Sequence, residues 1–277
     1  MDKRPDPKPK KHATLWQSYL FWDELQRMRI RHGNRLSSAV AGKTRMDAKT
    51  EETIISWASE AETHAQKTMV NLGTEVGPIW YWLISIKGIG DHTAAKLLAL
   101  FDDVAEFSTV SKFWRYAGYG LYDYWCDKNG KPMAPKIGDK VVDGKRVPTP
   151  AIPEPDWHLE THKDMRMTGW ALPYNNTLKK ECYLVTEHFI RQQTPGYIDV
   201  YYEEKARIKS EHPEPEPDTS SNWPTKYTPS HIDRMARRKM LKIFLSLMWS
   251  SWRESEGLPV TLPYVLAHMD HEHLVEL

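Results

Sequence analysis

A glycine-containing turn between two helical segments is the most specific chemical signal in the sequence. The turn reads Lys87-Gly88-Ile89-Gly90, and the next segment begins Asp91-His92-Thr93. Glycines let a backbone approach a phosphate without a Cβ in the way, and the N–H groups of a helix N-terminus point at an anion. We therefore predict a phosphate-binding turn, against the alternative of a tight inter-helix turn without a ligand. The predicted contacts are Lys87, Gly88, Ile89, Gly90, Thr93 and Lys96.

A second group of basic residues lies in the last predicted helix, which runs from Ser230 to about Ser255. Its first half is basic, up to Lys242, and its second half is apolar. Basic clusters are typical of polyanion binding, although they also occur on plain solvated faces. The further predicted DNA contacts are Arg115, Arg234, Arg237, Arg238 and Lys239. Three aromatics beside Arg115 are candidates for stacking on bases, although most tryptophans should be core: Phe113, Trp114 and Tyr116.

Three groups of metal-capable side chains are weaker candidates. They are His268, Asp270, His271 and His273; Asp102, Asp103 and Glu106; and His158, Glu160 and His162. The first group lies in a terminal tail, which holds ligands poorly. The second group fits the polar start of a loop. The third group lacks the HExxH spacing of a metal pair on a helix. We expect no metal and no cofactor, and we assign no catalytic residue.

Composition and length limit the class of protein. The 277 residues are 40% hydrophobic and 27% charged, which is ordinary globular usage, and 12 Trp with 13 Tyr argue against disorder. The separated Cys126 and Cys182 exclude a disulfide framework and a cysteine-rich zinc site. The longest nearly uncharged stretch, 76–86, is too short to span a bilayer, so we expect a cytoplasmic protein without a membrane partner. The net charge of +1 hides blocks of +7 over residues 1–50, −6 over 51–110, +4 over 111–180 and −4 over 181–230.

Hydrophobic periodicity predicts a mainly α-helical fold. The expected helices are 13–31, 47 or 50 to 72, 79–85, 92–101, 110–116, 176–192, 197–210 and 230–255. Residues 32–43 are expected to be a linker, and the second helix to pack within the chain rather than form a dimerising coiled coil. Asn129-Gly130 and Asp143-Gly144 predict a small β-hairpin insertion. The expected parts are 1–43 with a basic leader, 44–120 with the glycine turn, 121–170 with the hairpins, and 171–277 with a proline-rich acidic linker at 212–229.

The run from Leu83 to Gly118 resembles a known family. The Gly-Ile-Gly turn followed by Thr93-Ala94 looks like a helix-hairpin-helix element, which reads DNA backbones without sequence preference. The same run continues with Phe107, Phe113 and Tyr116-Ala117-Gly118, and in this order it resembles the C-terminal domain of the DEDD-type insertion-sequence transposases. Members of that family also have a RuvC-like nuclease domain and a coiled coil. The resemblance covers roughly residues 50–255 and is most specific at 83–118.

The chain departs from that family in three respects. The nuclease domain with its acidic residues is expected upstream, where only a basic segment of about 50 residues stands. The family has a serine nucleophile after Tyr-Ala-Gly, whereas no serine occurs from Lys112 to Lys209, and Thr168 is a poor substitute without a base. Lys87 stands where the family usually has proline. We therefore do not expect the chain to cut DNA by itself.

The resemblance implies a DNA-binding protein of a transposition or recombination system that contacts the phosphate backbone. Two alternatives stay open. One is a divergent transposase or nuclease that acts with a partner catalytic subunit, and the other is a structural or assembly protein without nucleic acid. DNA is the expected partner. Three further partners stay open: RNA (including a guide RNA), a separate nuclease subunit, and a second copy of the chain.

Overall fold

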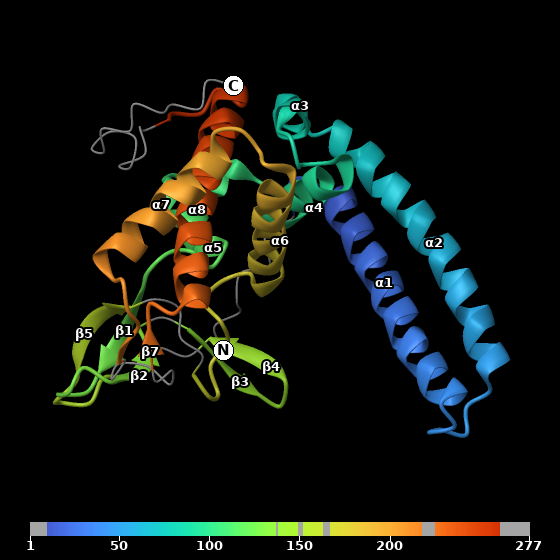
Figure 1. The fold of residues 1–277 in the computed structure, drawn as a ribbon, viewed down its shortest axis with the longest axis horizontal. Helices are drawn as coiled ribbons and strands as arrows, with labels where there is room; N and C mark the ends of the chain where they lie inside the picture. The colour runs from blue at the N-terminus through green and yellow to red at the C-terminus, as the bar shows by residue number, and fades with distance from the viewer. Residues whose placement is uncertain (1–9, 137, 149–151, 163–166, 218–224, 261–277) are drawn as a thin grey trace, which may run out of the picture. The chain divides into compact units, whose positions relative to one another are not determined.

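The structure is built mainly from α-helices, as the periodicity predicts, with short antiparallel sheets. It is a computed structural model that describes residues 10–136, 138–148, 152–162, 167–217 and 225–260. The chain divides into two compact units, Met1–Val104 and Ala105–Leu277, at the short 3-10 helix Val104–Glu106 (Figure 1). The first helix packs against the second, and the helix at 110–116 packs against the last.

Two long helices, α1 (Ala13–Val40) and α2 (Ala48–Thr74), run antiparallel beside one another in the first unit (Figure 1). Asp47 begins α2, because its carboxylate accepts the N–H of Thr50 at 2.8 Å. Arg29 on α1 donates its Nε to Glu62 on α2 at 2.5 Å. The prediction of packing within the chain is confirmed.

The predicted linker at residues 32–43 is wrong, since α1 continues to Val40. The hydroxyls of Ser37 and Ser38 donate to carbonyl oxygens four residues earlier, which lets these polar side chains fit a helix. His32 Nδ1 lies 2.5 Å from Glu51 Oε2 on α2. Packing against α2 therefore overrides the low helix propensity of this segment.

Two shorter helices, α3 (Pro78–Ser85) and α4 (Asp91–Phe101), complete the first unit and follow the predicted bounds closely. Gly73 on α2 allows Trp80 to approach, because a Cβ at that position would lie 2.5 Å from the Trp80 ring. Leu83 and Leu97 are fully buried. Every residue of α4 from Thr93 to Phe101 is buried, so α4 is the central helix of this unit.

The second unit begins with α5 (Val110–Tyr116) and the predicted β insertion. Strand β1 (Tyr122–Cys126) lies between β2 (Pro132–Pro135) and β5 (His158–His162), antiparallel to both. A separate hairpin pairs β3 (Asp139–Val142) with β4 (Lys145–Pro148). Its turn residues Asp143 and Gly144 have φ of +50° and +72°, as a two-residue hairpin turn requires.

Three helices form the rest of this unit: α6 (Asn176–Gln192), α7 (Tyr197–Glu211) and α8 (Pro229–Ser255). Helix α8 begins one residue before the predicted start at Ser230, and its N-cap is Thr228, whose hydroxyl accepts the N–H of His231 at 3.3 Å. Phe189 stacks on Tyr197 and meets Phe244 edge-on in the core. Within the described part of the predicted proline-rich linker, β6 (Glu216–Pro217) pairs with β7 (Thr225–Lys226).

Gly118, which ends the Tyr-Ala-Gly stretch, gives a testable prediction. It has φ of +80°, and a Cβ there would lie 2.7 Å from Lys179 Cδ and 2.9 Å from Tyr174 Cδ2. We expect Gly118→Ala to lower the free energy of unfolding by about 1–3 kcal/mol, because both the backbone and the packing are strained. Chemical denaturation measures this loss. The control is Gly144→Ala, which has positive φ in open space. An equal loss in both variants would contradict the packing contribution.

Candidate nucleic-acid interface

The predicted phosphate-binding turn joins α3 to α4 and is closed by local hydrogen bonds. The N–H of Ile86 donates to Leu83 O at 3.2 Å, and the N–H of Ile89 donates to Ile86 O at 3.0 Å. Gly88 has φ of +96°, which glycine adopts at little cost. Ile86 and Ile89 are buried. These two side chains therefore anchor the turn to the core of the first unit.

The outward side of the turn presents Lys87 and Gly90, which are both exposed. Gly90 is the N-cap residue of α4, and a Cβ built on it would meet no heavy atom within 4 Å. The first N–H groups of a helix have no intrahelical acceptor. A ligand can therefore approach the N-terminus of α4 over Gly90. Thr93, the predicted contact one turn into α4, is only 9% exposed.

Lys96 lies in the interior of the first unit rather than on this outward side. It is 7% exposed, and its Nζ lies 5.4 Å from the centroid of the Trp22 ring on α1. His92 meets the same indole edge-on. Burial, and then the Lys96 charge, lower the pKa of His92 to about 4, so the imidazole is neutral at pH 7. Lys96 thus adds no exposed charge beside the turn.

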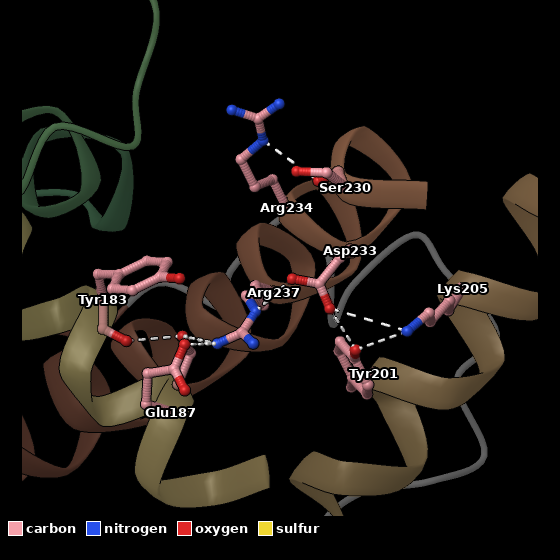
Figure 2. Close-up of polar contacts among 9 residues, drawn as sticks. Tyr183, Glu187, Tyr201, Lys205, Ser230, Asp233, Arg234 and Arg237 are labelled. Carbon is pink, nitrogen blue, oxygen red and sulfur yellow. Dashed lines mark hydrogen bonds and ion pairs between the residues drawn. The ribbon is translucent and has the colours of Figure 1, made fainter. Parts of the chain in front are cut away.

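Arg237, a predicted DNA contact in the second unit, is held by carboxylates from two helices. Its Nε donates to Asp233 Oδ2 and its Nη1 to Glu187 Oε1, each at 2.6 Å. Figure 2 shows Arg237 between these two carboxylates, while Arg234 points away from both. Burial lowers the pKa of Arg237, but the carboxylates outweigh it and the net shift is upward. Arg237 therefore ties α6 to α8.

Tyr201 on α7 shares the Asp233 carboxylate (Figure 2). Its hydroxyl donates to Asp233 Oδ1 at 2.5 Å, and Lys205 Nζ donates to the Tyr201 oxygen at 2.9 Å. Burial and the bond to Asp233 raise the pKa of Tyr201. The hydrogen bond between Tyr201 and Asp233 therefore joins α7 to α8.

The remaining predicted cations of α8 have different partners. Lys239 Nζ lies 2.9 Å from Glu204 Oε2 on α7. Arg238 Nη2 donates to the carbonyl oxygens of Tyr119 at 3.0 Å and Gly120 at 3.3 Å. Arg234 is exposed, and among the described residues it donates to the Ser230 carbonyl of its own helix. A carboxylate thus neutralises Lys239, whereas Arg238 and Arg234 bond to neutral carbonyls.

Glu204 makes the stability of the second unit depend on pH. The hydrogen bond from Arg207 lowers the pKa of Glu204, and the bond from Lys239 adds to this effect. Burial acts in the opposite direction, and the net result is a pKa of about 2 in place of 4.5. A carboxyl group with a depressed folded-state pKa stabilises the fold above its unfolded pKa and loses this contribution as the pH falls through the folded value. We expect Glu204→Gln to be less stable than wild type at pH 7, and the difference to shrink between pH 4.5 and 2. Denaturant unfolding at several pH values measures it; a constant difference would contradict the prediction.

Arg115 and its aromatic neighbours divide between surface and core. Arg115 is exposed, and its guanidinium lies 5.4 Å from the centroid of the Tyr122 ring. Phe113 is fully buried and packs edge-on against Phe107, so this candidate for stacking on bases is a core residue. Trp114 and Tyr116 are half-buried.

Lys242 was not among the predicted contacts, yet it lies in the same region. Its Nζ is 4.4 Å from the centroid of the Trp114 ring. The Trp114 indole N–H in turn donates to the Lys242 carbonyl at 3.2 Å. Lys242 follows Arg238 by four residues, a helical spacing that is visible in the sequence. The contact between Lys242 and Trp114, which are 128 residues apart, cannot be seen in the sequence.

The candidate metal ligands do not assemble into a site in the described ranges. Asp102 accepts the backbone N–H groups of Lys11 and His12, at 3.1 and 2.9 Å, and so fixes the start of α1. His158 Nε2 lies 2.6 Å from Glu160 Oε1 on β5. Within the residues that the structure describes, no group of three or more His, Cys, Asp or Glu could hold a metal ion. The cluster from His268 to His273 lies outside the described residues.

Comparison with known families matches residues 81–140 to the transposase IS116/IS110/IS902 family. This segment contains most of α3, the turn, α4, α5, β1 and β2. Searches of curated proteins and of solved structures found no match. None of the described helices has the length and apolar character needed to cross a membrane. The segment that carries the turn is thus transposase-like, which supports a transposase-related role.

Proposed function

We propose that the chain binds DNA in a transposition or recombination system, and that the turn between α3 and α4 contacts the phosphate backbone. The observation that carries the proposal is the transposase family match over residues 81–140, because it contains this turn with its outward Lys87 and Gly90. Phosphate contacts position a protein on DNA without reading the base sequence. The proposal therefore concerns backbone binding and no particular sequence.

The proposed contact uses the backbone more than side chains. Gly88 and Gly90 let a phosphate oxygen approach the main chain, and the partial positive charge at the N-terminus of α4 favours the anion. Lys87 adds a full charge beside the same turn. Two helices joined by such a turn act in this proposal as a helix-hairpin-helix element. Lys96 is left out of the contact set because its side chain is buried.

The second unit contributes fewer cations than its sequence suggests. Arg237 and Lys239 are paired with carboxylates and hold α6 and α7 against α8. Arg115, Arg234 and Arg238 are the predicted contacts that this proposal retains. Freeing Arg237 for DNA would take this cation away from Glu187, and freeing Lys239 would remove one of the two cations on Glu204, which opposes binding.

A fluorescence-anisotropy titration of labelled duplex DNA at several salt concentrations tests the proposal. We expect the logarithm of the affinity to fall linearly with the logarithm of the salt concentration, because each neutralised phosphate releases counterions. Branched and single-stranded DNA with the same label show which structure is preferred. Absence of binding by the folded chain, or binding that ignores salt, would contradict the proposal and favour an assembly protein with a protein partner.

A second candidate function is a divergent transposase that acts with a separate catalytic subunit. The description of the matched family as transposases favours it. A metal-dependent cleavage assay on supercoiled DNA distinguishes the two functions. Cleavage that is lost when an acidic residue of this chain is mutated would support the enzyme, whereas binding without cleavage would support the binding protein.

A further inference from the structure

Three cations of α8 share one face of the helix. Arg234, Arg238 and Lys242 follow one another at four-residue spacing, which places side chains on the same side of a helix. At 1.5 Å per residue they extend over roughly 12 Å. From Arg234 to Arg253 the helix has six basic residues and no acidic one. This face of α8 is therefore strongly positive.

Among the described residues, carboxylates neutralise the neighbouring cations of α8 but not these three. Arg237 pairs with Asp233 and Glu187, and Lys239 pairs with Glu204. Across the described ranges, Arg234, Arg238 and Lys242 form no ion pair with a carboxylate. Figure 2 shows the difference in direction for Arg234, which leaves the helix on the side away from Asp233 and Glu187. One side of α8 is thus neutralised within the protein and the other is not.

Contacts with α5 and the loop after it hold two of the three cations in place. Lys242 lies over the Trp114 ring, and the Trp114 N–H bonds to the Lys242 carbonyl. Arg238 is fixed by the carbonyls of Tyr119 and Gly120, and both bonds use Nη2. Its Nε and Nη1 groups bond to none of the described residues, so these donors can bind a ligand. Side chains ordered before binding lose less entropy on binding.

In the part of the chain that the structure describes, no carboxylate pairs with Lys242. Burial, and then the charge of Arg238, lower the pKa of Lys242 to about 8. The titratable side chains of α5, which packs against this part of α8, are Lys112, Arg115 and Tyr116, and none is a carboxyl. Glu187 of α6 and Glu204 of α7 are already bound to Arg237 and Lys239. An incoming anion would therefore meet cations that no carboxylate of the described ranges neutralises.

We propose that Arg234, Arg238 and Lys242, with the indole of Trp114, form a second phosphate-binding site for a DNA strand. Guanidinium and ammonium groups donate charge-assisted hydrogen bonds to phosphate oxygens. The phosphate would supply the negative charge that the carboxylates of the described residues do not supply to these three cations. The inference rests on the proposed function, because it presupposes a DNA ligand. It uses none of the residues of the turn between α3 and α4, so the two sites can be tested separately.

The test compares the full-length wild-type chain with the double variant Arg234→Gln/Lys242→Gln in the duplex-DNA titration. Arg238 is left in place because it also holds the loop at residues 119–120. Lys209→Gln on α7 removes one exposed charge elsewhere in the same unit and serves as the control. We expect the double variant to bind at least about tenfold more weakly and the salt slope to fall by about 1.8, since each phosphate contact contributes roughly 0.9.

The outcomes separate the site from the function. In the first outcome, the wild type binds with a steep salt dependence, and the double variant loses no more affinity per charge removed than Lys209→Gln does. This result would overturn the second site and leave the proposed function standing. A folded wild type that binds no duplex DNA would overturn the proposed function and this inference with it. A selective loss of affinity and slope in the double variant supports both.

The pH dependence of binding provides an independent measurement. A phosphate favours the charged form of Lys242, so wild-type affinity should fall as the pH rises through about 8. Lys242→Arg keeps its charge at all these pH values, so we expect it to bind DNA at pH 9 as well as at pH 7. Identical pH profiles for wild type and Lys242→Arg would overturn the site.

Discussion

Gly90→Glu is expected to weaken binding of duplex DNA by at least about tenfold while the protein stays folded. Tenfold corresponds to about 1.4 kcal/mol. Two unit charges 4 Å apart at a protein surface interact by up to about 4 kcal/mol before salt screening, so one carboxylate at the turn is sufficient. The substitution places that carboxylate where the phosphate is proposed to lie, next to the first N–H groups of α4.

Gly90 is the suitable position because its surroundings tolerate a side chain. Its φ is −91°, and a Cβ would meet no heavy atom within 4 Å. A negative charge at a helix N-terminus is also favourable for the helix. Gly88, by contrast, has φ of +96°, so any substitution there strains the backbone and mixes a folding effect with a binding effect.

Gly90→Gln is the matched control, since it has the same size and no charge. We expect Gly90→Gln to bind within a few fold of wild type in the anisotropy titration, and both variants to unfold within about 0.5 kcal/mol of wild type. Equal DNA affinity of the Glu and Gln variants would show that no phosphate lies near the N-terminus of α4.

The sequence predicts the local elements well because short-range signals determine them. The bounds of α5 and α6 are those predicted from periodicity and from the glycine and proline breaks. The hairpin at Asp143-Gly144 forms where the dipeptide predicts it. The error at residues 32–43 has a tertiary cause, because helix α2 supports a segment whose own glycine, serine and asparagine content favours a linker.

The candidate site was harder to predict because its chemistry depends on contacts between distant residues. Arg237 and Lys239 look like DNA contacts in a basic run, but Glu187 and Glu204 lie 50 and 35 residues away in sequence and meet them in space. Lys96 follows the glycine turn closely in sequence and is a predicted phosphate contact there, yet α4 is the buried centre of its unit. The sequence contains these acidic partners, but it does not show which cation each one meets.

The aromatic residues that recur in the resemblance to transposases have a packing role in the second unit. Phe107 meets Phe113 edge-on, and its ring centroid lies 5.1 Å from that of Tyr116. Its carbonyl accepts the indole N–H of Trp249 on α8 at 2.7 Å. Trp249 therefore connects α8, which carries the proposed second site, to the α5 region.

Trp249→Ala is expected to cost about 3–5 kcal/mol of unfolding free energy, the largest stability effect predicted for this chain. The indole is fully buried, and Arg253 lies 5.2 Å from its ring centroid. Removing the ring leaves a cavity beneath Arg253 and removes a buried hydrogen bond to Phe107. Denaturant unfolding measures the loss.

Two further substitutions separate the cavity from the hydrogen bond. Trp249→Phe keeps most of the ring but no N–H, and Arg253 Nη1 still donates to the Phe107 carbonyl at 3.3 Å, so that carbonyl keeps one partner. We expect a loss of only about 1–2 kcal/mol for it. Trp57, which is 67% exposed on α2, is the control, and Trp57→Ala should stay within about 0.5 kcal/mol of wild type. If Trp249→Ala were no less stable than Trp57→Ala, α8 would not depend on this contact, and the support for the proposed site would have to come from α6 and α7 instead.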